Sequence, residues 1–219
     1  RSAFGEWLNR DQRSERIGEY LAILQQLLAP NEGGLDYQGL YFQLENAGVA
    51  RRELPAPALV LDDSQSHALV ATHAQTCLLA PGPPQRLASE IQRWRAIQPS
   101  LTFACTFGLI LGDSEDLAWE TAASLLPVPD LPTESLATVP RARHPLRQWE
   151  VHPNLLQITP GQPLILVGTP QQIATRLQEL HGAGLNHLIV EGGPAVSEVL
   201  RFGEQVLPLL RKERLHHEH

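Results

Sequence analysis

The order of apolar and polar residues predicts helices and strands over most of the chain. In residues 11–29, leucine and isoleucine recur every three or four positions between charged residues, the pattern of an amphipathic helix. Residues 37–44, with the sequence YQGLYFQL, are aromatic and alternate around Gly39, which predicts a short extended excursion or a hairpin. The first quarter of the chain therefore contains a helix followed by a short extended segment.

From Pro57 onward, short apolar runs alternate with amphipathic helices, which is typical of βα units in a parallel sheet. We expect strands at 58–61, 76–80, 101–111 and 187–190, and a further short apolar run occupies 164–167. We expect helices at 64–72, 83–97, 115–126, 171–181 and 194–210, with Asp113-Ser114 and Gly168-Thr169-Pro170 as two of the amino-terminal caps. Four βα units can be recognised, and four do not close a barrel.

Residues 127–163 interrupt this alternation. They contain eight prolines and few periodic positions. We therefore interpret 127–163 as a long proline-rich excursion inside a single domain spanning 1–219. Segments of this kind are usually lids, binding loops or disordered.

Composition and charge narrow the classes of protein. With 42% hydrophobic and 19% charged residues, the chain can bury a core. The formal charge of −7 and the scattering of the 17 basic residues argue against a nucleic-acid surface. No apolar run approaches the roughly 18 to 20 residues of a membrane span, and the amino terminus lacks a secretory signal. We therefore expect a cytoplasmic protein, in which Cys77 and Cys105 are two buried reduced thiols rather than a disulfide or a metal site.

Several motifs occur in the same order as in a known family. Residues 166–210, LVGTPQQIATRLQELHGAGLNHLIVEGGPAVSEVLRFGEQVLPLLR, resemble the carboxy-terminal part of luciferase-like flavin-dependent monooxygenases, above all the alkanesulfonate monooxygenase branch. Further similar segments are the helix at 11–28, the YQGLYF hairpin at 37–42, the loop APGPP at 80–84 and the helix start at 113–119. These collinear matches extend over nearly all of the chain.

The resemblance implies an α/β fold derived from the (β/α)₈ TIM barrel, of which this chain would hold only the later half. Aligned to the family, it begins after the fourth strand, and the absence of methionine agrees with an additional segment before Arg1. Half a barrel leaves sheet edges and an inner face uncovered. We therefore expect a homodimer, a partner that carries the other strands, or a longer polypeptide that completes the barrel.

The family uses reduced FMN and dioxygen to oxidise an organic substrate, and a flavin reductase is a possible source of the reduced FMN. The loop that binds the flavin phosphate in the family corresponds to Ser64, Gln65 and Ser66, whose hydroxyls and helix amino terminus favour an anion. The preceding Asp62-Asp63 opposes one, and capping of a helix by Ser64 or Ser66 is the alternative. Gly192 and Gly193 could also cradle a phosphate, or form only a tight turn.

The chain departs from the family at its ionisable active-site positions. The arginine and histidine of the seventh strand in the alkanesulfonate branch fall on Thr106 and Gly108, another arginine falls near Thr159, and a tyrosine falls on Gly193. We therefore name no catalytic residue and no metal ligand. The resemblance leaves a diverged FMN-dependent monooxygenase with a different substrate, or a non-catalytic relative that acts as a scaffold in a larger assembly. A small-ligand binding module is a third alternative.

Overall fold

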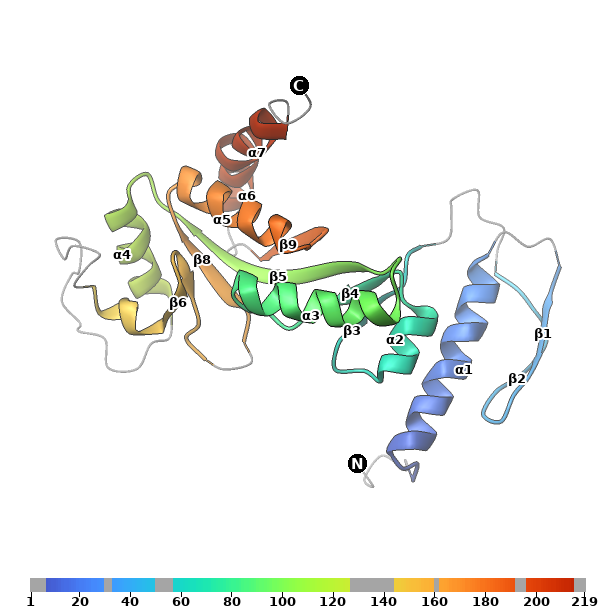
Figure 1. Ribbon diagram of the computed structural model, residues 1–219. Helices are drawn as coiled ribbons and strands as arrows, with labels where there is room; N and C mark the ends of the chain where they lie inside the picture. Colours follow the sequence, from blue (N-terminus) through green and yellow to red (C-terminus); the bar gives the residue numbers. More distant parts are fainter. Residues whose placement is uncertain are drawn as a thin grey trace. The chain divides into compact units, whose positions relative to one another are not determined.

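The computed structural model describes residues 7–29, 33–49, 57–126, 144–159, 162–191 and 196–214. The chain divides into two compact units, 1–77 and 78–219, each with its own helices and strands (Figure 1).

Unit 1 begins with helix α1 (Arg10–Leu28), whose first turn is closed by a reciprocal capping box between Asn9 and Gln12. Strands β1 (Leu35–Gln38) and β2 (Gln43–Ala47) then form an antiparallel hairpin. The unit also contains β3 (Val60–Asp62) and α2 (His67–His73), and its boundary falls within β4 (Thr76–Leu78). The helix expected from the sequence is confirmed, and of the two alternatives for the extended segment that follows it the structure shows the hairpin.

Glu19 of α1 joins that helix to the tip of the β1–β2 hairpin. Its carboxylate accepts hydrogen bonds from the backbone N–H groups of Leu40, Tyr41 and Phe42, at 2.7, 3.0 and 3.2 Å. Gly39 makes this approach possible, because a Cβ at that position would lie 2.4 Å from Oε2 of Glu19. One carboxylate thus fixes three successive amides of the turn.

The sheet of unit 2 is built on β5 (Thr102–Leu111), the longest of the apolar runs. Strand β9 (His187–Glu191) runs parallel to the first part of β5, and β8 (Leu164–Gly168) runs parallel to its last part. Beyond β8, strands β7 (Leu155–Leu156) and β6 (Glu150–His152) are added antiparallel. The α/β fold with parallel strands is confirmed, and the sheet formed by the described strands is not closed.

The helices of unit 2 are α3 (Pro84–Ile97), α4 (Glu115–Leu125), α5 (Pro170–Gly182), α6 (Val196–Arg201) and α7 (Leu207–Arg214). Both expected caps are observed: Ser114 accepts from the N–H of Leu117, and Thr169 forms a capping box with Gln172. A π-helical segment, Phe202–Val206, which the sequence did not predict, joins α6 to α7. None of the helices among the described residues is long and apolar enough to cross a bilayer.

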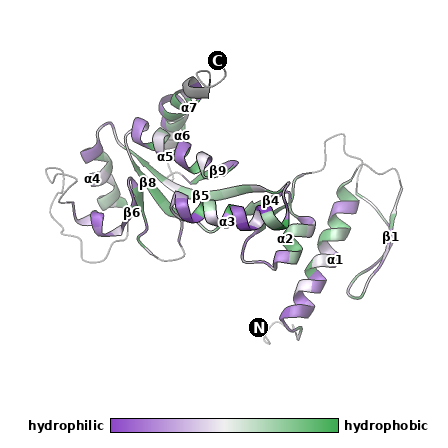
Figure 2. Cartoon of the chain, viewed as in Figure 1, coloured by the Kyte–Doolittle hydropathy of each residue, from purple (hydrophilic) through white to green (hydrophobic). Residues whose placement is uncertain are grey.

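Both faces of the sheet contribute to the core, and Figure 2 shows the strands β5 and β8 as largely hydrophobic. Phe103 and Phe107, on one face of β5, are fully buried, and the guanidinium of Arg95 from α3 lies 5.9 Å from the ring centroid of Phe103. A second cluster joins α4, β5, β7, β8 and the 3₁₀ helix at Pro145–Trp149; its buried members are Ile110, Ala118, Trp119, Ala122, Leu146, Leu156 and Val167.

Part of the proline-rich excursion is a hairpin that extends this sheet. Strands β6 and β7 are joined at Pro153-Asn154, and Asn154 has a φ of 63°, a left-handed conformation that asparagine tolerates in turns. The side chain of Asn154 donates to the carbonyl of Val167 at 2.9 Å, and its backbone N–H donates to Glu150 at 2.8 Å. The hairpin is thus bonded to the end of β8, while 127–143 and 160–161 lie outside the described residues.

Candidate functional site

The loop expected to bind a phosphate follows β3, and its three candidate residues are exposed. Asp62 accepts hydrogen bonds from two backbone N–H groups of the loop. Its carboxylate accepts from the N–H of Ser64 at 2.8 Å, and its backbone carbonyl accepts from the N–H of Gln65 at 3.1 Å. The hydroxyl of Ser66 accepts from the N–H of Leu69 at 3.3 Å and caps α2. Much of the hydrogen-bonding capacity of this loop therefore serves the loop itself.

The charges near this loop also affect Cys77 on β4. Burial, followed by the charges of Asp63 and Asp62, raises the pKa of the Cys77 thiol to about 12. The thiol therefore stays protonated at neutral pH, and the same two carboxylates disfavour an anion nearby. Cys77 and Cys105 are both buried, as expected from the sequence, and they do not form a disulfide with each other.

In unit 2, one face of β5 and β9 is partly open. Thr106 is in register with Ile189, and Gly108 with Glu191, so these residues lie on the same side of the sheet. Ile189 is 45% exposed and Glu191 is exposed, whereas Cys105, on the opposite side of β5, is buried. The open face therefore carries the two positions at which the family resemblance places ionisable residues.

Glu191 is not one of the positions at which the sequence predicts a site residue. It lies at the carboxyl end of β9, beside Gly108, where the side chains of parallel α/β folds commonly meet their ligands. The only available signal was a polar residue at the end of the apolar run HLIVE. The glycines expected to cradle a phosphate, Gly192 and Gly193, lie outside the described residues. Thr159 is exposed after β7, and its carbonyl accepts from the N–H of Gln162.

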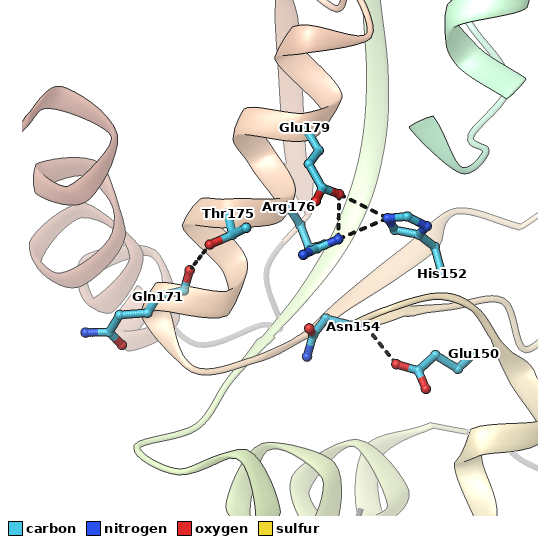
Figure 3. A network of polar contacts seen from close by, with 7 residues as sticks. All are labelled: Glu150, His152, Asn154, Gln171, Thr175, Arg176 and Glu179. Atoms are coloured by element: carbon cyan, nitrogen blue, oxygen red, sulfur yellow. Dashed lines mark hydrogen bonds and ion pairs between the residues drawn. The ribbon is translucent and has the colours of Figure 1, made fainter. Parts of the chain in front are cut away.

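A second polar cluster joins β6 to α5 (Figure 3). Nε2 of His152 lies 3.0 Å from Oε2 of Glu179 and 3.0 Å from Nη1 of Arg176, and Nη1 of Arg176 lies 2.5 Å from the same carboxylate oxygen. His152 and Glu179 border an open groove of about 340 Å³, together with Pro84, Gln85, Ala88 and Ala183.

This cluster lies on the other side of the sheet from Thr106. A small neighbouring cavity is lined by His152, Arg176 and Leu166, and Leu166 is in register with Leu109 of β5. Leu109 alternates with Gly108 along the strand, so the two point to opposite faces. Arg176 and Glu179 are 24 and 27 residues from His152 in the sequence, so only the meeting of β6 with α5 brings these partners together.

His144 has a local structural role. Nδ1 of His144 accepts from the N–H of Leu146 at 3.3 Å, and its ring packs edge-on against Trp119. Burial lowers the pKa of His144 more than the nearby Asp116 raises it, so the ring is neutral in the core. Throughout the described ranges, no three His, Cys, Asp or Glu residues are placed to hold a metal ion.

Solved structures with this fold include a riboflavin lyase in complex with modified FMN and riboflavin, with a TM-score of 0.68 and 19% identity over 97% of this chain and 60% of that one. The EDTA monooxygenase from Chelativorans sp. BNC1 has a TM-score of 0.66 and 16% identity, over 97% of this chain and 62% of that one. An F420-dependent secondary alcohol dehydrogenase with an F420–acetone adduct has a TM-score of 0.61 and 16% identity, over 94% and 64%. This chain thus spans less than two thirds of their lengths.

These identities establish the fold alone. The sequence pattern that defines the luciferase-like monooxygenases, however, matches residues 1–187, which is most of the chain. The chain therefore belongs to the luciferase-like monooxygenase family.

Proposed function

We propose that this chain is part of a flavin-dependent monooxygenase that oxidises an organic substrate with reduced FMN and dioxygen. The observation that carries the proposal is the family match over residues 1–187. The similar riboflavin lyase structure contains a modified FMN, and the similar dehydrogenase contains an F420 adduct, so a flavin-type cofactor suits this fold. F420 is the second candidate cofactor.

The open face of β5 and β9 is where we propose that the flavin ring and substrate lie. Thr106 is neutral, Gly108 has no side chain, and Ile189 is apolar, so this face can accept a flat ring. When bound, the flavin supplies the oxidative chemistry, and these residues orient it and exclude water. Glu191 is the acidic group beside Gly108, and its charge favours substrates that are neutral or cationic.

For the phosphate group of FMN we propose Ser64, Gln65 and Ser66, together with Gly192 and Gly193, from their places in the family pattern. The bonds that Asp62 makes within the first loop oppose this assignment. A phosphate bound there would have to compete with them or use the exposed hydroxyl of Ser64.

Completion of the fold by additional polypeptide is also part of the proposal. Among the described strands β9 pairs only with β5, so one of its edges and the face that bears Ile189 are available. We propose that a second copy, a partner or a further segment of the same polypeptide covers them. A flavin reductase would supply reduced FMN, and the reduced thiols of Cys77 and Cys105 support a reducing, cytoplasmic location.

The second candidate function is that of a non-catalytic scaffold in a larger assembly. It is favoured by the neutral residues at Thr106 and Gly108, neither of which can transfer a proton.

The test is an anaerobic ultrafiltration assay that measures binding of reduced FMN and of reduced F420. The sample is the protein purified under native conditions, together with any polypeptide that copurifies with it. We expect saturable binding of FMN. Ser64→Asp adds a negative charge to the candidate phosphate loop and should weaken FMN binding about tenfold or more. Ser89→Asp, an equivalent change at an exposed position of α3, should not. If the wild-type protein and its companions bind neither cofactor, the flavin proposal is wrong and the scaffold function remains.

A further inference from the structure

Nε2 of His152 faces one group that needs a hydrogen-bond acceptor and another that needs a hydrogen-bond donor (Figure 3). Nε2 lies 3.0 Å from Nη1 of Arg176, which can only donate a hydrogen bond, and 3.0 Å from Oε2 of Glu179, which when ionised can only accept one. A nitrogen that carries a hydrogen donates, and one that carries none accepts. Nε2 can therefore satisfy one of these two neighbours at a time.

Two side chains of this cluster are largely buried. The side chains of His152 and Arg176 are only 17% and 18% exposed. Nε of Arg176 is buried and, within the described part of the chain, has no hydrogen-bond partner, so the guanidinium is held on this side through Nη1.

The groups around His152 come from helices α5 and α3 and from strands β6, β7 and β8. On α5 the groups that contact His152 are Arg176 and Glu179, whereas Nδ1 of His181 lies 3.0 Å from the carbonyl oxygen of Leu185. On β6 the neighbouring carboxylate is Glu150, which accepts from the N–H of Asn154 and lies 3.9 Å from Nε of Arg147. Helix α3 contributes Pro84, Gln85 and Ala88 to the groove, and β7 and β8 contribute Leu155 and Leu166, none of which titrates. Histidine is the side-chain type that ordinarily changes charge between about pH 5 and 8.

We propose that the proton on Nε2 of His152 decides which residue of α5 holds the β6–β7 hairpin. When the imidazole is neutral, Nε2 is bare and accepts from Arg176, while Nδ1 carries the hydrogen. When it is an imidazolium, Nε2 donates to Glu179, and Arg176 bonds only to the same carboxylate. Because the partner of Nε2 changes with its proton, the attachment of this part of the proline-rich excursion to α5 responds to pH. This response does not depend on whether the chain binds a flavin.

The first test reads the ring nitrogens directly, by NMR of the full chain labelled with ¹⁵N-histidine. We expect neutral His152 to be the Nδ1–H tautomer in the wild type. Arg176→Gln removes the obligate donor and should convert His152 to the Nε2–H tautomer bonded to Glu179. Glu179→Gln should leave Nε2 bare, and Arg211→Gln, a change at an exposed arginine of α7, should alter nothing. An Nε2–H tautomer in the wild type would overturn the proposal.

The second test measures amide hydrogen exchange of residues 150–156 between about pH 5 and pH 8, the range in which histidine ordinarily changes charge. After correction for the intrinsic pH dependence, we expect the wild-type exchange rate to change by about threefold, the order of one partly exposed ion pair replacing a hydrogen bond. His152→Gln should show no such change, and His187→Gln, which removes an exposed histidine from β9, should keep it. A pH response that persists unchanged in His152→Gln would contradict the mechanism.

Discussion

Gly112 lies where the end of β5 passes closest to α4, and we predict that alanine there strongly destabilises unit 2. An added Cβ would lie 2.4 Å from the backbone nitrogen of Ala118 and 2.7 Å from its Cα, whereas ordinary contacts begin at 3.4 Å. The obstacle is helix backbone, which cannot rotate away, so α4 must move by about 1 Å. That movement would separate the fully buried Ala118 and Trp119 from Leu146. Overpacking of this kind costs about 1 to 3 kcal/mol, and we expect the upper end of that range.

The assay is urea unfolding followed by tryptophan fluorescence, because Trp94, Trp119 and Trp149 all lie in unit 2. The matched control is Gly203→Ala in the π-helical segment, where an added Cβ meets no atom within 4 Å. Alanine there should stabilise by up to about 1 kcal/mol, through its higher helix propensity. A Gly112→Ala protein that unfolds within about 0.5 kcal/mol of wild type would refute the packing argument.

Two further predictions concern unit 1. Burial raises the pKa of Glu19, but the hydrogen bonds from the N–H groups of Tyr41, Leu40 and Phe42 together lower it further. Because the folded pKa is below the unfolded value of 4.5, the clamp should be complete above that pH and be lost as the pH falls through the folded pKa. Glu19→Gln should remove this pH dependence from amide exchange at 40–42, and Glu45→Gln, at an exposed position of β2, should not. With a thiol pKa of about 12, Cys77 should resist iodoacetamide at about pH 8 until the chain is unfolded in urea, as mass spectrometry would show; alkylation of the native chain would contradict its burial.

Local pattern was sufficient for most of the elements. The helices α1, α3 and α5 and the strand β5 begin and end within a residue or two of their expected positions. Spacing of apolar residues and the caps at Ser114 and Thr169 act over a few residues, so they can be recognised without knowledge of the rest of the fold. The collinear motifs likewise pointed to the family, which the match over 1–187 confirms.

The candidate phosphate loop shows where local pattern stops. The sequence left capping by Ser64 or Ser66 open, and the structure assigns the cap to Ser66 and engages the N–H of Ser64 with Asp62. The proline-rich region shows the same limit: its composition indicated an excursion, but β6 and β7 form because β8 offers them a strand to pair with.

By itself, then, the amino-acid sequence determined the local elements, the likeness to the family and the absence of ionisable residues at Thr106 and Gly108. Only the tertiary structure placed Glu191 beside Gly108 and brought His152 within 3.0 Å of Arg176, 24 residues away. The physical reason is that an apolar pattern states which face of an element is buried, but not which element covers it. The partner of a polar side chain depends on that second choice.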